Sequence, residues 1–103
     1  MYNPTMQPSE AAVTRAVLKY INGLPRAKAE KRHGSVYTGA GKQDILACVA
    51  GRHVEIELKR PGEEPRPLQD RVRQQWERAG AITGVAHSVD EVQALFKAHG
   101  LIR

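Results

Sequence analysis

The stretch DILACVAGRHVEIELK, residues 44–59, decides the fold of this 103-residue chain. Two runs rich in β-branched residues flank Gly51-Arg52, which favours a β-hairpin with that dipeptide as its turn. Ile45 then faces Leu58, and the residues between them pair so that one face of the hairpin is wholly apolar. We therefore expect this face to lie against the core.

The opposite face of the hairpin carries acidic and basic side chains. In this register Asp44 lies opposite Lys59 with Glu57 diagonal to it, and a shift of two residues would set Asp44 directly opposite Glu57. Two carboxylates about 4 Å apart repel by roughly 4 kcal/mol at an effective dielectric near 20, which a divalent cation between them would reverse. Such oxygen ligands suit Mg²⁺ or Mn²⁺. Alternating Glu and Lys is also typical of a solvated outer strand, so both interpretations stay open.

The rest of the chain predicts three helices, in the ranges 9–23, 67–80 and 88–100, a strand at 81–87, and a short edge strand within the basic stretch 27–38. Ser9 can cap the first helix, Pro67 suits the start of the second, and Ser88 with Glu91 forms a capping box for the third. The second helix should bury a stripe of four residues, Leu68, Val72, Trp76 and Ala79. The order α-β-β-β-α-β-α indicates an α/β fold with a mixed sheet flanked by helices.

Length and composition limit the class of protein. We expect residues 1–103 to form one domain, and the single cysteine, Cys48, excludes an internal disulfide and is expected to be a buried, inert thiol. The sequence lacks an apolar run long enough for a membrane span and lacks a signal peptide, which predicts a cytoplasmic protein of a bacterial or phage-infected cell with no membrane partner. The net charge of +5 favours a polyanion as partner.

Asp44, a gap of twelve residues and then Glu57-Leu58-Lys59 resemble the D…(D/E)-x-K core of the PD-(D/E)XK nuclease superfamily. More narrowly, the chain resembles the virus-type replication-repair nuclease family, VRR-NUC. The similar parts also include residues 41–44, Gln69 after a proline-rich loop, and the strand at 80–85. Gln43 departs from the family, which has proline there, and we expect this position mainly to shape the start of the strand.

The resemblance implies a restriction-endonuclease-like core and a role for each matching residue. Asp44, Glu57 and the carbonyl of Leu58 would bind Mg²⁺ or Mn²⁺, and Lys59 would orient the attacking water. Glu10 matches a glutamate that supplements the metal ligands, although a carboxylate there also suits the helix dipole. Gln69 matches a glutamine near the active site. We expect DNA contacts from six basic residues, namely Lys31, Arg32, His33, Lys42, Arg60 and Arg66.

These implications predict a Mg²⁺- or Mn²⁺-dependent deoxyribonuclease that acts as a homodimer on branched DNA such as four-way (Holliday) junctions, in DNA repair. An alternative is a basic module that binds nucleic acid without catalysis. A weaker one is a restriction-like nuclease that reads a duplex sequence, for which no recognition element stands out. Trp76 is expected in the core rather than as a platform for base stacking.

Overall fold

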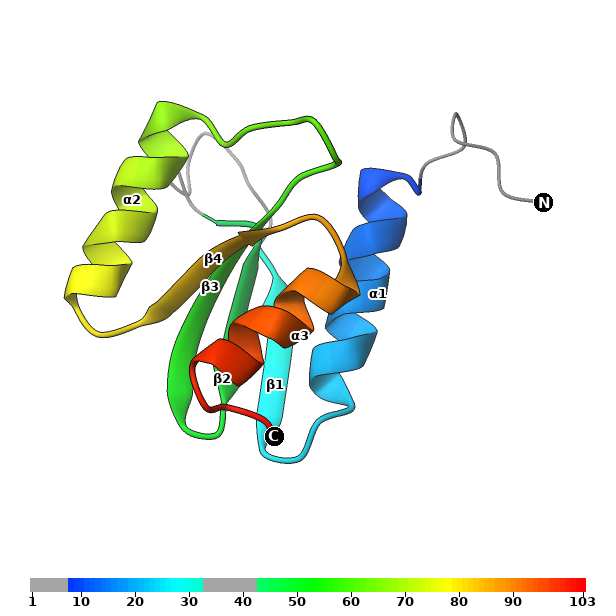
Figure 1. Ribbon diagram of the computed structural model, residues 1–103, viewed down its shortest axis with the longest axis vertical. Coiled ribbons are helices and arrows are strands. Elements are labelled where there is room, and N and C mark those ends of the chain that lie inside the picture. The colour runs from blue at the N-terminus through cyan, green and yellow to red at the C-terminus, as the bar shows by residue number, and fades with distance from the viewer. Residues whose placement is uncertain (1–7, 33–42) are drawn as a thin grey trace.

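In the part of the chain that the structure describes, four strands form one mixed sheet in the order in which they follow along the chain, and three helices flank it (Figure 1). The computed structural model describes residues 8–32 and 43–103, so the predicted contacts of His33 and Lys42 lie outside it. The elements are α1 (Glu10–Asn22), β1 (Ala27–Lys31), β2 (Ile45–Val49), β3 (Arg52–Leu58), α2 (Pro67–Arg78), β4 (Ile82–Ala86) and α3 (Val89–Ala98). The predicted class and element order are confirmed.

The apolar face of the hairpin lies in the core, as the sequence predicts. Its alternate residues on β2 and β3 are at most 3% exposed, and α1 and α3 cover them with Val17, Ile21, Val92 and Phe96. α1 and α3 contact each other on this side, whereas α2 lies apart from them beside β3 and β4 (Figure 1). Gly84 allows α3 to approach closely, because a Cβ there would lie 2.8 Å from a methyl of Leu95.

The turn of the hairpin corrects the predicted register. The two turn residues are Ala50 and Gly51, with φ of 51° and 80°, rather than Gly51-Arg52. Positive φ at both positions is the type I′ turn, whose twist matches paired strands and which favours glycine second. Ile45 therefore pairs with Ile56 instead of Leu58. Because the shift is two residues, every side chain keeps its predicted face.

The helix starts follow the predicted capping residues. Ser9 accepts a hydrogen bond from the amide of Ala12, and Ser88 accepts one from the amide of Glu91. Glu91 closes its capping box one residue early, because its carboxylate accepts from the amide of His87 rather than that of Ser88. Pro67 begins α2, as expected.

The predicted buried stripe of α2 is wrong in part. Leu68 is 43% exposed and Ala79 is exposed, while the one fully buried residue of the helix is Gln69. Val72 and Trp76 are half-buried. The sheet surface beneath α2 is polar. The helix is therefore rotated so that the Gln69 amide and the Trp76 indole face the sheet, while Leu68 does not.

The outer edge of β1 is occupied by a side chain of α1. The amide oxygen of Asn22 accepts from the backbone N–H of Ala29 at 2.8 Å, and its amide nitrogen donates to the Ala29 carbonyl at 3.1 Å. One side chain thus satisfies both backbone groups that Ala29 turns away from β2.

Within the described ranges, each helix is too short or too polar to cross a membrane.

Candidate active site

Asp44 and Glu57 meet where the β2–β3 ladder ends. Because Ile45 pairs with Ile56, the next pair outward is Asp44 with Glu57, which is the shifted register that the sequence left open. Oδ2 of Asp44 accepts a hydrogen bond from the backbone amide of Leu58 at 2.9 Å. The backbone carbonyl of Asp44 accepts from the amide of Arg32 at 2.8 Å, so β1 and β3 both hold this residue.

Glu57 is 1% exposed, although the sequence allowed it to lie on a solvated face. Burial raises its pKa to about 8, and the hydrogen bond and charge of Asp44 act in the same direction, while Lys59 opposes them. Among the described atoms, no donor contacts the buried Oε2 of Glu57, so the bond to Asp44 forms only when one of the two carboxyls carries a proton. The pair therefore needs either a shared proton or a cation.

Lys59 lies on the same face of the sheet as Glu57, two residues further along the chain. Its Nζ is 3.5 Å from Oε1 of Glu57, and its side chain is 15% exposed. The backbone amide of Lys59 donates to the carbonyl of Ala86, which extends the parallel β3–β4 pairing past the last residue of β3. This bond fixes the lysine at the carboxyl end of a central strand, beside the two acids.

Gln69 reaches Glu57 from the first turn of α2. Its Nε2 donates to Oε1 of Glu57 at 2.9 Å, and its Oε1 accepts from the amide of Arg66 at 2.8 Å. Gln43, fully buried, donates from Nε2 to the backbone carbonyl of Gln69 at 2.9 Å. Two glutamines therefore hold α2, Glu57 and the start of β2 in one arrangement.

The role of Gln43 was not predicted, since nothing in a single polar residue before a strand distinguishes a buried partner from a surface one. The ion pair of Arg32 with the fully buried Glu55 was not predicted either. The guanidinium binds both carboxylate oxygens, one of them at 2.8 Å. A signal was present in the alternation of His53, Glu55 and Glu57, which predicts three polar side chains on one face.

An aromatic stack continues this polar layer toward α2. Nε2 of His53 donates to the Glu55 carboxylate at 2.7 Å, and its ring lies on that of Trp76 with 4.6 Å between the centroids. The guanidinium carbon of Arg32 lies 5.9 Å from the centre of the same indole. Trp76 thus holds α2 on the sheet, and Arg32 already has internal partners instead of facing solvent alone.

Glu10 and Lys31 line a cavity of about 320 Å³ together with Asp44. The structure thus brings the first-helix glutamate to the same hollow as one of the two acids. Across residues 8–32 and 43–103, however, no three acidic, histidine or cysteine side chains stand close enough to hold a metal ion. Asp44 and Glu57 are the pair that the fold brings into contact.

The other predicted DNA contacts have different surroundings. Arg60 is about half-exposed and forms an ion pair with Glu63 at 2.7 Å. Arg66 is exposed immediately before α2. Both lie on the loop that leads from Lys59 to Gln69, so they border the acids without contacting them.

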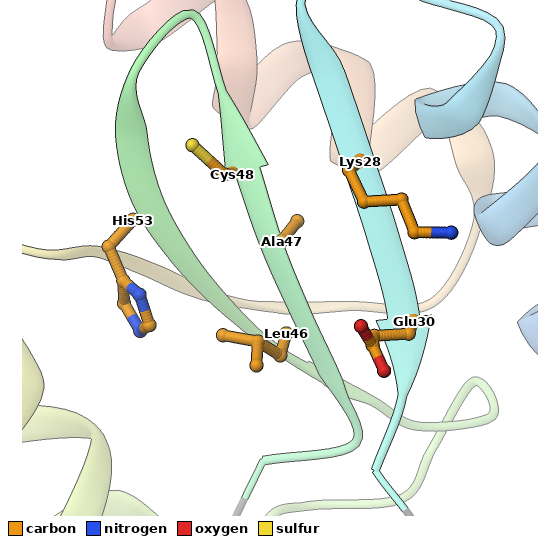
Figure 2. A pocket seen from close by; sticks show the side chains of 6 residues that line it. All are labelled: Lys28, Glu30, Leu46, Ala47, Cys48 and His53. Carbon is orange, nitrogen blue, oxygen red and sulfur yellow. The ribbon is translucent and has the colours of Figure 1, made fainter.

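A second hollow of about 300 Å³ lies on the outer face of β1, β2 and β3, where Figure 2 shows Leu46 and Cys48 between Lys28 and Glu30 on one side and His53 on the other. Cys48 is exposed there, which contradicts the expectation of a buried, inert thiol. The cause is that α2 covers β3 and β4 and leaves this part of the sheet open.

A divalent cation fits the chemistry of the two acids. The unpartnered oxygen of Glu57, the carboxylate of Asp44 and the neighbouring Leu58 carbonyl are all oxygen donors, which Mg²⁺ and Mn²⁺ prefer. A cation would also oppose the two effects that raise the pKa of Glu57, which are burial and the charge of Asp44.

No protein-family model matches the chain, and no curated protein matches it. A solved structure described as a VRR_NUC domain superposes with a TM-score of 0.72, covering 85% of this chain and 94% of its own at 23% identity. Another, described as a VRR_NUC domain protein, gives 0.72 over 87% of this chain and 86% of its own at 18% identity. The chain therefore has the fold of VRR_NUC domain structures, which confirms the fold that its sequence resemblance implies.

Proposed function

We propose that this chain is a Mg²⁺- or Mn²⁺-dependent endonuclease that hydrolyses phosphodiester bonds in DNA. The observation that carries the proposal is a pair of acids, the half-buried Asp44 and the buried Glu57, with Lys59 beside them at the end of a central strand. A glutamate on a solvated strand face would be exposed to water, whereas Glu57 is buried and no donor contacts one of its oxygens. The VRR_NUC-like fold supports the same reaction class.

Asp44, Glu57 and the Leu58 carbonyl would hold the cation. Glu10 lines the cavity beside Asp44 and would have to move closer to supplement them. When bound, the cation supplies positive charge to the phosphate and lowers the pKa of a water molecule. The amide of Leu58 orients the Asp44 carboxylate, and Gln69 orients that of Glu57. These bonds keep both carboxylates in position before the substrate arrives, so no reorganisation is needed during the reaction.

Lys59 would act directly on the reacting phosphate. Its ammonium group, partly shielded and next to Glu57, is placed to orient the attacking water and to balance the negative charge that develops on the phosphoryl oxygens. Arg60 and Arg66 lie on the loop between Lys59 and α2 and would contact neighbouring phosphates. Lys31, in the cavity with Asp44, would do so from the other side.

We propose branched DNA, such as a four-way junction, as the substrate, and a homodimer as the active form. A twofold dimer carries two equivalent sites and can present one to each of two strands.

A cleavage assay tests the reaction. Labelled four-way junction and linear duplex are incubated with the protein in Mg²⁺, Mn²⁺ or EDTA, alongside Asp44→Asn, Glu57→Gln and Lys59→Ala. We expect metal-dependent cutting, strongest on the junction, and its loss in each variant. Arg15→Gln, a change of an exposed residue on α1, serves as the control and should cut like the parent.

Cutting that persists in Asp44→Asn or Glu57→Gln would place the chemistry elsewhere. DNA that is bound but intact in every metal would favour the non-catalytic binding module instead.

A further inference from the structure

α2 has two faces of different chemistry. Toward the sheet it turns a stripe at helical spacing made of Gln69, Val72, Arg73 and Trp76, all buried or half-buried. Outward it exposes Leu68, Arg71, Gln74, Gln75, Glu77 and Arg78. The exposed residues of the helix are therefore mostly arginine and glutamine, whose side chains donate hydrogen bonds, and Glu77 is the one exposed acid among them.

The acids of α2 are already engaged. Asp70 pairs with Arg73 at 2.7 Å, and Glu77 accepts a hydrogen bond from the hydroxyl of Thr83 on β4. Arg71 and Arg78 are exposed and, within the part of the chain that the structure describes, neither forms an ion pair. Neither charge is thus neutralised by an ion pair on the outer face.

The helix begins at the proposed active site. Gln69, in its first turn, donates to Glu57, and the rest of the helix runs away from that point toward the turn that precedes β4 (Figure 1). Twelve residues at 1.5 Å each make a helix of about 18 Å, which equals roughly five base pairs of duplex DNA. DNA with its scissile phosphate at Lys59 can therefore pass along the outer face.

The chemistry of this face suits a duplex backbone better than a single strand. Arg71 and Arg78 are seven residues apart, or about 10 Å along the helix, close to the roughly 12 Å width of the major groove. Binding of single strands relies on exposed aromatic rings, and the ring of Trp76 faces inward against His53. The open sheet face in Figure 2 suits DNA less, because Glu30 lies in it.

We propose that the outer face of α2 binds the phosphate backbone of duplex DNA beside the cleaved bond, with Arg71 and Arg78 as its principal contacts. The proposal rests on the proposed nuclease function and adds the surface that grips the duplex arm. It also assigns two arginines that the sequence resemblance does not place at the site.

Binding of a labelled duplex, longer than α2, is measured by fluorescence anisotropy in EDTA over a series of salt concentrations. Arg71→Gln and Arg78→Gln should each reduce the slope of log K against log salt by about 0.9, and affinity near 0.1 M salt should fall about eightfold for each. The double variant should lose about twice the slope. Arg15→Gln, the same change on the exposed side of α1, should leave the slope unchanged.

Three results would overturn the proposal: unchanged slopes in both arginine variants, an equal loss in Arg15→Gln, or an equal loss on a single strand of the same sequence. These results are distinguishable from failure of the nuclease reaction. If Arg71→Gln binds and cuts normally while Asp44→Asn is inactive, this proposal fails and the nuclease stands. If no metal supports cutting but the salt slopes fall as expected, the surface stands and the reaction fails.

A second measurement locates the surface on the substrate. Junctions with one arm shortened below about five base pairs should be cut with a higher KM and the same kcat, since α2 then lacks phosphates to contact. Arg71→Gln/Arg78→Gln should be insensitive to the shortening. A kcat that falls while KM is constant would contradict the assignment.

Discussion

Glu57 is the residue on which burial and charge conflict most directly. Its carboxyl is closed off from water, contacts Asp44, and has its pKa raised to about 8, so in the absence of a cation it holds a proton near neutral pH. The unfolded chain gives up that proton near pH 4.5. The folded state therefore binds one proton more than the unfolded state between these two values.

We predict that the metal-free protein becomes less stable as the pH rises from about 5 to 8. The contribution of Glu57 is fully present below the unfolded pKa and is lost as the pH rises through the folded one. Glu57→Gln, which cannot ionise, should flatten this dependence. Urea unfolding in EDTA at several pH values measures both, and parallel curves for the two proteins would contradict the prediction.

Gln43 acts on the site through another residue. Gln43→Leu removes a buried hydrogen bond to the Gln69 carbonyl, so the free energy of unfolding should fall by about 1–3 kcal/mol. Gln93→Leu on α3 is the matched control, because the half-buried Gln93 side chain has no hydrogen bond to the described residues, and it should change stability by less than about 0.5 kcal/mol. Equal losses in both variants would show that the bond contributes nothing specific.

Among the elements, α2 is the one held by polar contacts instead of an apolar stripe. Its attachment combines the Gln69–Glu57 bond with the stack of Trp76 on His53. Polar contacts need defined geometry, so the helix and the site that it completes are positioned together.

The Trp76–His53 stack should be measurable as an energetic coupling. In a double-mutant cycle with Trp76→Ala and His53→Ala, we expect the two losses of unfolding free energy to be non-additive by about 0.5–1.5 kcal/mol. Denaturant unfolding of the parent, both single variants and the double variant provides the four values. Additive losses would mean that the rings are neighbours without a favourable interaction.

The elements also differ in how much of their structure could be predicted from the sequence. Hydrophobic alternation in residues 44–59 and the caps Ser9 and Ser88 predicted the hairpin and the helix starts, because these signals are local. The turn was misplaced by one residue, since glycine suits either position of a two-residue turn. The rotation of α2 depended on Glu55 and Glu57 being buried, a tertiary fact that a strand pattern of Glu and Lys does not contain.

At the scale of the whole molecule, the site combines residues of the hairpin with residues of a helix that precedes it and a helix that follows it in the sequence. α1 contributes Glu10 to a cavity shared with Asp44, and α2 contributes Gln69 to Glu57. A cation at the acid pair would therefore connect segments that are far apart in the sequence. Its binding should stabilise the whole fold rather than one loop.

We predict that Mn²⁺ raises the melting temperature of EDTA-treated protein. A ligand at one hundred times its Kd adds about 2.7 kcal/mol when it binds only the folded state. Glu57→Gln and Asp44→Asn should lose most of this increase, and Arg15→Gln should keep it. A similar increase in all four proteins, measured by differential scanning calorimetry, would indicate binding at another place.

The contact between Asn22 and Ala29 constrains how copies of this protein can assemble. An open strand edge is a template on which sheets of separate molecules join and fibres grow. Here a side chain of the same molecule occupies the middle of that edge with both of its polar atoms. Two copies cannot fuse their sheets along β1 without displacing it, so a twofold assembly must form through another surface, and each molecule is protected from open-ended polymerisation.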